Sequence, residues 1–252
     1  MELLRLVMNL QNIKLYFSKW ERSNFETYKL AYHLYGGSVC THPDVLQFLS
    51  KASGVVLEFY CKMSQGRISG ACYSVKGNLS LQDKRFPVVF DDVLFPFSED
   101  NGGFLPFNTK RLSPGHKGNF FNVVHSGRLK HKIAYIKNSF SKSTEKKRNG
   151  ELNKFLREGG EVKNINAFTI EEVASLYITL FKDRWQNKLK CFSYSDLCET
   201  LTSLQHLLFG CVLVKNGEVC ALDIIFKSEA KDFIYFDDIN GGYSSLYPEY
   251  NL

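Results

Sequence analysis

Residues 209–239 read FGCVLVKNGEVCALDIIFKSEAKDFIYFDDI, and this stretch decides the fold. Two apolar runs rich in β-branched residues flank the dipeptide Asn216-Gly217, which accepts the positive φ angles of a type I′ turn. A polar break at residues 227–232 leads to a third apolar run, Phe233–Ile239, which carries two acids near its end. The stretch therefore predicts an antiparallel meander of three strands.

The same order of elements occurs earlier in the chain. Apolar runs at residues 55–61 and 68–75 flank a Gln65-Gly66 turn, and a third run reads VVFDDV where the later one reads IYFDDI. A helix-like segment precedes each meander, Pro43–Ser50 in the first case and Asp196–Phe209 in the second. We predict an α/β (α+β) fold made of two copies of one unit, each with helices and an antiparallel meander. Chance agreement of short strings is the alternative.

Helix signals complete this outline. Apolar residues recur every three or four positions over Met1–Tyr35, which predicts one amphipathic helix, packed on the core or lying on a membrane. Thr41 is the expected N-cap of the short helix that follows it, and Asp196 that of the later one. Thr169 and Glu172 have the spacing of a capping box, so another helix is expected to begin there.

Positive charge is concentrated in one part of the chain. The formal net charge is +6, and residues 128–163 hold eleven Lys or Arg against four Glu, a local balance of +7. Residues 130–159 are helix-like, with a centre that is polar on all faces. Lys146, Lys147 and Arg148 are its densest basic cluster. A solvated face, a site for a phosphate-bearing molecule and contact with an acidic membrane all fit this pattern.

Familiar catalytic patterns are absent from the sequence. It has no glycine-rich phosphate loop, no nucleophile elbow and no zinc-protease motif. Asp91 and Asp92, like Asp237 and Asp238, are adjacent in predicted strands, so the two carboxylates of each pair point to opposite faces. One acid of each pair could line a cleft, but neither pair forms an acid and base dyad by itself.

No metal site and no membrane span are expected. The seven Cys show no ligand spacing, and His116, His125 and His131 are irregularly spaced. No apolar run approaches the ~18 to 20 residues that a spanning helix needs. Reduced thiols favour the cytosol, and peripheral contact with a membrane stays open.

Several segments resemble known families. Residues 140–152, FSKSTEKKRNGEL, followed by Gly159-Gly160 and by the helix that ends in Arg184 and Trp185, resemble the segments around the junction of Fem-type tandem acyltransferase (GNAT-like) domains. Residues 35–43, YGGSVCTHP, and residues 86–92, FPVVFDD, look like the macrophage-inducible Mig family of enterobacterial virulence proteins. That similarity runs from about Tyr28 to the last residue.

The resemblance implies a function and a division of the chain. It implies resistance to cationic antimicrobial peptides in a Gram-negative bacterium, and a cytoplasmic protein peripherally associated with the inner membrane. It also implies acyl or aminoacyl transfer, with acyl-CoA or aminoacyl-tRNA as donor. The lobes are expected at residues 1–127 and 161–252, joined by a basic helical junction at residues 128–160. The second lobe is expected to be incomplete, because the donor-binding turn and helix that should follow Tyr247 are missing before Leu252.

Three hypotheses remain open. The first is an acyl or aminoacyltransferase-like protein that confers resistance to cationic antimicrobial peptides; its catalytic residues are unknown, and the incomplete second lobe argues against activity in this form. The second is a non-catalytic protein that binds anionic lipid of the inner membrane through its basic helices. The third, less favoured, is a nucleic-acid-binding regulator. Candidate residues for anion or donor binding are Lys146, Lys147, Arg148 and Arg184, and those for a cleft are Asp91, Asp92, Asp237, Asp238, Trp185 and Tyr247.

Overall fold

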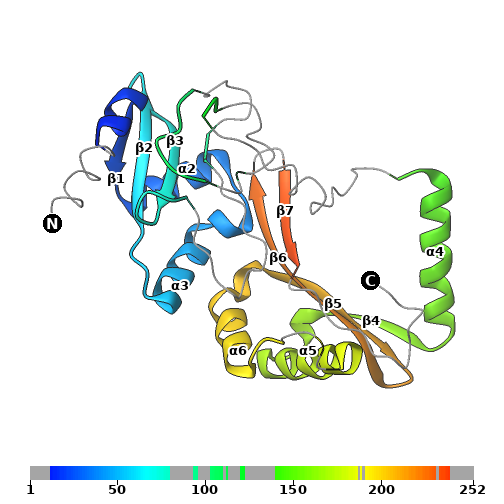
Figure 1. Cartoon of the computed structure of the whole chain (residues 1–252). Coiled ribbons are helices and arrows are strands. Elements are labelled where there is room, and N and C mark those ends of the chain that lie inside the picture. The colour runs from blue at the N-terminus through cyan, green and yellow to red at the C-terminus, as the bar shows by residue number, and fades with distance from the viewer. Residues whose placement is uncertain are drawn as a thin grey trace. The chain divides into compact units, whose positions relative to one another are not determined.

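The chain divides into two compact units, Met1–His131 with Ser228–Phe236, and Lys132–Lys227 with Asp237–Leu252. Figure 1 labels the helices and strands of the chain. The three-part division expected from the sequence remains a prediction. The computed structural model describes residues 12–79, 93–95, 103–109, 112, 120–122, 140–186, 188, 191–230 and 233–238.

The first unit is a three-stranded antiparallel sheet with helices between its first and second strands. The sheet has the order β1-β2-β3. Leu94 extends it beyond β3, since its main chain exchanges two hydrogen bonds of 2.8 Å with Ala71. The elements are β1 (Trp20–Ser23), α2 (Phe25–Tyr35), the 3-10 helix η1 (Val39–Thr41), α3 (Pro43–Ser53), β2 (Glu58–Ser64) and β3 (Arg67–Ser74), after a helical segment at residues 12–18.

The single helix expected over Met1–Tyr35 is wrong, because β1 interrupts it. Lys19 has a φ of 59°, a left-handed conformation that ends the segment at residues 12–18. The chain then pairs with β2 and re-enters a helix at Asn24, whose side chain accepts a hydrogen bond from the amide of Thr27. A four-residue edge strand is too short to show a two-residue period, so the helical period on both sides of it concealed it.

The two faces of the first sheet have different covers. On the helix face, the ring of Phe59 lies 5.5 Å from that of Phe25 and 5.2 Å from that of Tyr28, both in α2. On the other side, here called the loop face, Tyr60 lies 4.7 Å from the ring of Phe107. The loop face belongs to a buried cluster made of Leu15, Trp20, Tyr60, Cys72, Leu79, Val93, Phe95, Leu105, Phe107, Leu112 and Phe120.

The glycines that follow α2 form a tight turn at the edge of this core. Gly36 has a φ of 70° and its amide donates to the carbonyl of Tyr32, which ends the helix. A side chain on Gly37 would lie 2.7 Å from Oγ1 of Thr41 and 2.8 Å from Leu94. The turn at Gly36 and Gly37, which belongs to the segment at residues 35–43 that resembles a family motif, is therefore closely packed in the first unit.

A second sheet, most of which belongs to the second unit, repeats this plan with an additional strand. It has the order β4-β5-β6-β7, and β5 pairs antiparallel with both β4 and β6. The elements are α4 (Lys142–Arg157), β4 (Gly160–Asn164), the 3-10 helix η4 (Ile165–Ala167), α5 (Ile170–Trp185), α6 (Tyr194–Ser203), the 3-10 helix η5 (Gln205–Leu207), β5 (Leu208–Lys215), β6 (Glu218–Ala230) and β7 (Phe233–Asp238). β6 and β7 contain the places at which the chain passes between the two units. The α/β fold class is confirmed.

Helix caps were predicted with mixed success. The capping box of Thr169 and Glu172 is confirmed at the start of α5, with both hydrogen bonds present. The cap of α6 is Ser193, whose Oγ accepts from the amide of Asp196, so Asp196 lies three residues inside. The cap of α3 is likewise His42 and not Thr41. In both cases the cap lies at a boundary that sequence patterns locate only to within a few residues.

The central hairpins of the two sheets have the same geometry. Gln65-Gly66 and Asn216-Gly217 both have positive φ at both positions, as a type I′ turn requires. In β2–β3, Met63 faces Ile68 but Lys62 faces Gly70, so Ser69 is a bulge. In β5–β6, Val214 faces Val219 but Leu213 faces Ala221, so Cys220 is a bulge.

A constant difference of 151 in residue number relates these positions, from 65 and 216 at the turn to 69 and 220 at the bulge. The bulged side chains also make the same bond. Oγ of Ser69 donates to the carbonyl of Lys62 at 3.0 Å, and Sγ of Cys220 donates to that of Leu213 at 3.3 Å. Two copies of one unit, as the sequence predicted, account for this agreement better than chance.

Candidate functional site

Lys142–Arg157 of the basic segment forms α4, which one aromatic ring anchors at its C-terminal end, and the part of the expected helix at residues 130–139 lies outside the described residues. Phe155 is the only buried residue of the helix. It packs with Leu213, Cys220 and Ala221 of the second sheet. The chain can turn into β4 beside this ring because Gly160 has no side chain, and a Cβ there would lie 2.6 Å from the ring of Phe155. One anchor leaves most of the helix surface to solvent.

The remainder of α4 is a well-capped polar helix. Oγ of Ser141 accepts from the amide of Thr144, while Glu145 in the first turn and Lys154 and Arg157 in the last turn complement the helix dipole. Apart from Phe155 and the half-buried Thr144, every residue of the helix is exposed. Its composition of six Lys or Arg and two Glu gives it a net charge of +4.

Three of these cations have acidic partners. Nη1 of Arg148 lies 3.1 Å from Oε2 of Glu151, and Nζ of Lys147 lies 4.0 Å from the same carboxylate. Nζ of Lys154 lies 3.8 Å from Glu158. Exposed pairs of this kind contribute about 0.3–0.5 kcal/mol each to the stability of the helix. Lys147 and Arg148 therefore have a structural role that the sequence did not predict.

The other three cations of α4 are Lys142, Lys146 and Arg157. Within the part of the chain that the structure describes, no hydrogen bond or ion pair involves their side chains. At 100° per residue, the three side chains fall within an arc of about 60° on the helix. Of the predicted basic cluster, Lys146 alone lies in this arc, so the structure separates it from its sequence neighbours.

The remaining predicted site residues are dispersed or not described. The guanidinium of Arg184 lies over the ring of Trp185, 4.8 Å from its centre, at the end of α5. Asp237 and Asp238 are the last residues of β7, and the structure describes only their main chain. Asp91, Asp92 and Tyr247 lie outside the described residues, as do His116, His125 and His131. The role of Arg184 in anion binding remains a prediction, as do the roles in a cleft of Asp91, Asp92, Asp237, Asp238, Trp185 and Tyr247.

Two groups of polar side chains on the sheets, one around Glu58 and one at Cys211 and Asp223, were not predicted from the sequence. On the loop face of the first sheet, the Tyr60 hydroxyl donates to Oε2 of Glu58 at 3.3 Å, and Arg22 pairs with Oε1 of Glu58 at 3.3 Å. Burial first, and then the Glu58 carboxylate, raise the pKa of Tyr60, so it stays neutral at physiological pH. The alternation of residues in β2 was the signal that could have placed Glu58 and Tyr60 on one face.

On the second sheet, Cys211 faces Asp223 across β5 and β6. Burial, followed by the Asp223 carboxylate, raises the pKa of the Cys211 thiol. A thiol whose pKa is raised is mostly protonated at neutral pH and is a poor nucleophile. Cys211 is therefore a poor candidate for carrying an acyl group.

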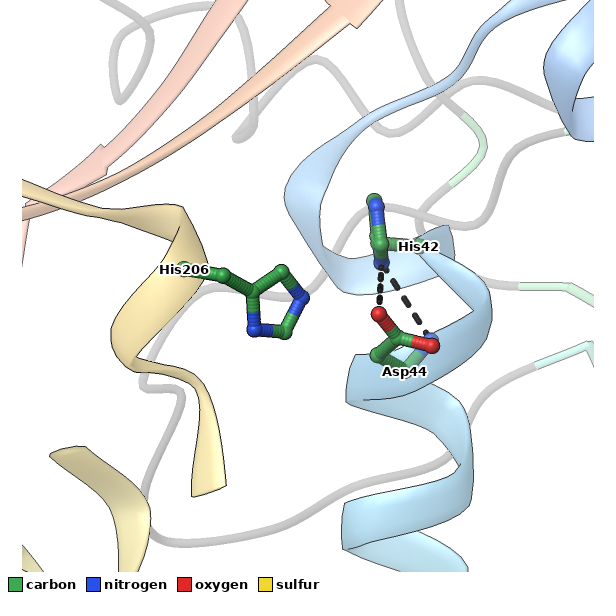
Figure 2. Close-up of side chains that lie close together, drawn as sticks. All are labelled: His42, Asp44 and His206. Atoms are coloured by element: carbon green, nitrogen blue, oxygen red, sulfur yellow. Dashed lines mark hydrogen bonds and ion pairs between the residues drawn. The ribbon is translucent and has the colours of Figure 1, made fainter. Parts of the chain in front are cut away.

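His42 and Asp44 begin α3 in the first unit (Figure 2). Nδ1 of His42 accepts from the amide of Asp44 at 3.2 Å and lies 3.9 Å from its carboxylate. This pattern places the proton of a neutral imidazole on Nε2. We assign this contact to helix capping, because the lone pair on Nδ1 accepts from the amide of Asp44 in the first turn of α3.

Comparison with known proteins places the chain in a family. No helix among the described residues is long and apolar enough to cross a bilayer. No curated protein and no solved structure matches the chain. The model of the Mig-14 family matches residues 42–249, which is most of the sequence. The chain belongs to the Mig-14 family.

Proposed function

We propose that this protein is a tandem GNAT-like acyltransferase that modifies an acceptor of the bacterial envelope and thereby protects against cationic antimicrobial peptides. The observation that carries the proposal is the repeated hairpin, with the same turn, bulge and side-chain bond at a constant offset of 151 residues. A doubled unit of helices and an antiparallel meander is the organisation that the resemblance to Fem-type proteins led us to expect.

Membership in the Mig-14 family is consistent with a bacterial protein linked to antimicrobial-peptide resistance. Cationic peptides are drawn to the envelope by its negative charge, so an aminoacyl group that esterifies an acceptor hydroxyl, and thereby adds an ammonium, weakens their binding. We place the action of the protein at the cytoplasmic face of the inner membrane, where acyl-CoA and aminoacyl-tRNA are both present.

The proposed reaction joins an acyl or aminoacyl group to an amine or hydroxyl of the acceptor. The acceptor nitrogen or oxygen attacks the carbonyl carbon of the donor thioester or ester, and a new C–N or C–O bond forms. The bond from carbon to the sulfur of CoA, or to the ribose oxygen of tRNA, breaks. The leaving group takes up the proton that the acceptor releases, so no oxidant or reductant is needed.

A donor assay tests the proposal. The purified protein is incubated with a Gram-negative envelope fraction and either ¹⁴C-labelled acyl-CoA or tRNA charged with a labelled amino acid. Transfer of label to the envelope, with matching release of free CoA or uncharged tRNA, is the expected result. Heat-denatured protein and reactions without envelope are the controls. A folded protein that neither binds nor consumes any of these donors would overturn the proposal.

A further inference from the structure

The exposed side of α4 combines unpaired cations with apolar side chains. Lys142, Lys146 and Arg157 occupy an arc of about 60°, and Leu152 and Leu156 lie beside them, within about 80° of Lys142, at 100° per residue. Leu152 is 45% exposed and Leu156 is 46% exposed. Both leucines are thus about half-exposed, whereas Phe155 is the residue of α4 that is buried. We call these five residues the α4 stripe.

We propose that the α4 stripe is the surface through which this protein binds an anionic lipid bilayer. The inference names a partner for the protein proposed above and rests on that function only for the location of the bilayer. A helix lying in a membrane interface buries an apolar edge among the acyl chains and holds its cations at the level of the headgroups. Leucines flanked by Lys and Arg along one side of an exposed helix are suited to that position.

The leucines favour a bilayer over a nucleic acid. Both partners would attract the three cations, since both present phosphates. Proteins that bind single-stranded nucleic acid add aromatic rings on which bases stack, and the one aromatic residue of α4, Phe155, is buried about 130° around the helix from the middle of the stripe. A phosphodiester backbone offers no apolar phase for Leu152 and Leu156, whereas a bilayer does.

Glu145, an acidic residue beside the α4 stripe, gives a further test of the proposed surface. Glu145 lies in the first turn of α4, and its angular position falls between those of Leu152 and Leu156. The structure shows no ion pair for Glu145 among the residues that it describes. Near an anionic surface this carboxylate opposes binding. Glu145→Gln is therefore expected to strengthen binding to anionic vesicles, by about fivefold if one charge acts near the surface.

The main test compares two triple variants of the full chain with the same change in net charge. Lys142→Gln, Lys146→Gln and Arg157→Gln remove the cations of the α4 stripe. The control removes the paired cations, by Lys147→Gln, Arg148→Gln and Lys154→Gln. Flotation measures binding to vesicles of 70% phosphatidylcholine and 30% phosphatidylglycerol, and to phosphatidylcholine alone. Circular dichroism checks that both variants keep their helix content.

The stripe variant is expected to bind anionic vesicles about a hundredfold more weakly than the wild type, at about fivefold per cation, and the control variant less than tenfold more weakly. Leu152→Gln with Leu156→Gln, which leaves every cation in place, is expected to lose at least tenfold. Equal losses in the two triple variants would show a diffuse charge effect and overturn the assignment. Absence of wild-type binding to anionic vesicles would overturn it as well.

A parallel gel shift with tRNA separates the two polyanions. If the stripe variant lost tRNA binding while all proteins bound vesicles equally, the stripe would be a nucleic-acid surface and the lipid proposal would be wrong. Vesicle binding is measured without any acyl or aminoacyl donor. Failure of the transferase assay therefore leaves this result intact, and failure of vesicle binding leaves the transferase proposal to its own test.

Discussion

The two sheets have the same central hairpin but different covers on the same face. In the first sheet, Tyr60 and Cys72 lie opposite each other on the loop face, and both are buried beneath an apolar cluster. An offset of 151 residues relates them to Cys211 and Asp223 of the second sheet, which also lie opposite each other and are only half-buried. Nearby, Phe209 is 49% exposed.

The difference shows which features of the repeated unit are local and which depend on the rest of the chain. Turn and bulge are set within about ten residues, so they can persist in both copies. The cover of the loop face comes from segments that lie far from the hairpin in sequence, such as those of Phe95 and Phe107. On the second sheet, Phe155 of α4 supplies a cover near the hairpin end. The corresponding face of the two sheets therefore differs both in the segments that cover it and in its side chains, which are Tyr60 and Cys72 in the first sheet and Cys211 and Asp223 in the second.

The largest expected effect is at Gly210, which is the counterpart of Phe59 in the first sheet. Gly210 has a φ of 154°, and a Cβ there would lie on the main-chain oxygen of Asp223. We expect Gly210→Ala to destabilise the second sheet by about 3 kcal/mol or more. The new Cβ would overlap a main-chain atom, so the backbone of β5 or of β6 would have to move. Hydrogen exchange in peptides from β5 and β6 would measure the change.

Gly217→Ala is the matched control. Gly217 also has a positive φ, but no atom lies within 4 Å of the position of its Cβ. Only backbone strain of about 1–2 kcal/mol is therefore expected. Equal effects of the two substitutions would contradict the close approach at Gly210. A loss of protection in β2 and β3 would show that the effect is not confined to the second sheet.

The next prediction compares the loop face of the first sheet with the corresponding face of the second sheet. Tyr60→Ala removes a buried ring that packs on Phe107, so a loss of about 3 kcal/mol is expected. Cys211→Ala, at the equivalent half-buried position, is expected to cost less than about 1 kcal/mol. Native-state hydrogen exchange on each sheet checks both values. Similar costs would mean that the two faces are covered equally well.

A smaller effect concerns the two turns. Gln65 and Asn216 both have a positive φ, and Asn tolerates the left-handed conformation better than Gln. Gln65→Asn is therefore expected to stabilise the first hairpin by about 0.5 kcal/mol, and Asn216→Gln to destabilise the second by a similar amount. Urea midpoints for both variants test the pair. A change of the same sign in both would show that the turns differ in geometry.

The smallest effect is electrostatic. The Asp223 carboxylate disfavours the thiolate of Cys211 and so contributes to its raised pKa. Asp223→Asn removes that negative charge, lowers the pKa and increases the thiolate fraction at pH 8. Faster alkylation of Cys211 by iodoacetamide, followed by mass spectrometry, is the expected outcome. Cys72 is fully buried and its pKa is well raised, so it serves as the unreactive control. An unchanged or slower rate at Cys211 would contradict the assignment.

Much of the fold follows from local signals in the sequence. Asn216-Gly217 and Gln65-Gly66 located both hairpins, and Thr169 with Glu172 located the start of α5, because turns and caps depend on neighbouring residues. β1 was missed because four residues at a sheet edge show no period, and their pairing with β2 depends on residues nearly forty positions away. Bulges depend on the partner strand and leave no signal in a single strand.

The candidate site was predictable in location but not in arrangement. The charge count placed it in the segment that forms α4, and adjacency in sequence grouped Lys146 with Lys147 and Arg148. On a helix, residues three and four apart are neighbours, so Glu151 pairs with Lys147 and Arg148 while Lys146 lies nearer Lys142. The apolar edge of the stripe depends on which leucine stays exposed, and packing of Phe155 decides that.

The central claim is that one unit occurs twice, and the hairpin registers test it most directly. Cross-strand NOEs and couplings through hydrogen bonds in the deuterated protein would report which residues face each other. The repeat predicts Lys62 opposite Gly70 and Leu213 opposite Ala221, with Ser69 and Cys220 each outside the ladder. A continuous ladder in either hairpin, with Ser69 opposite Lys62 or Cys220 opposite Leu213, would contradict it.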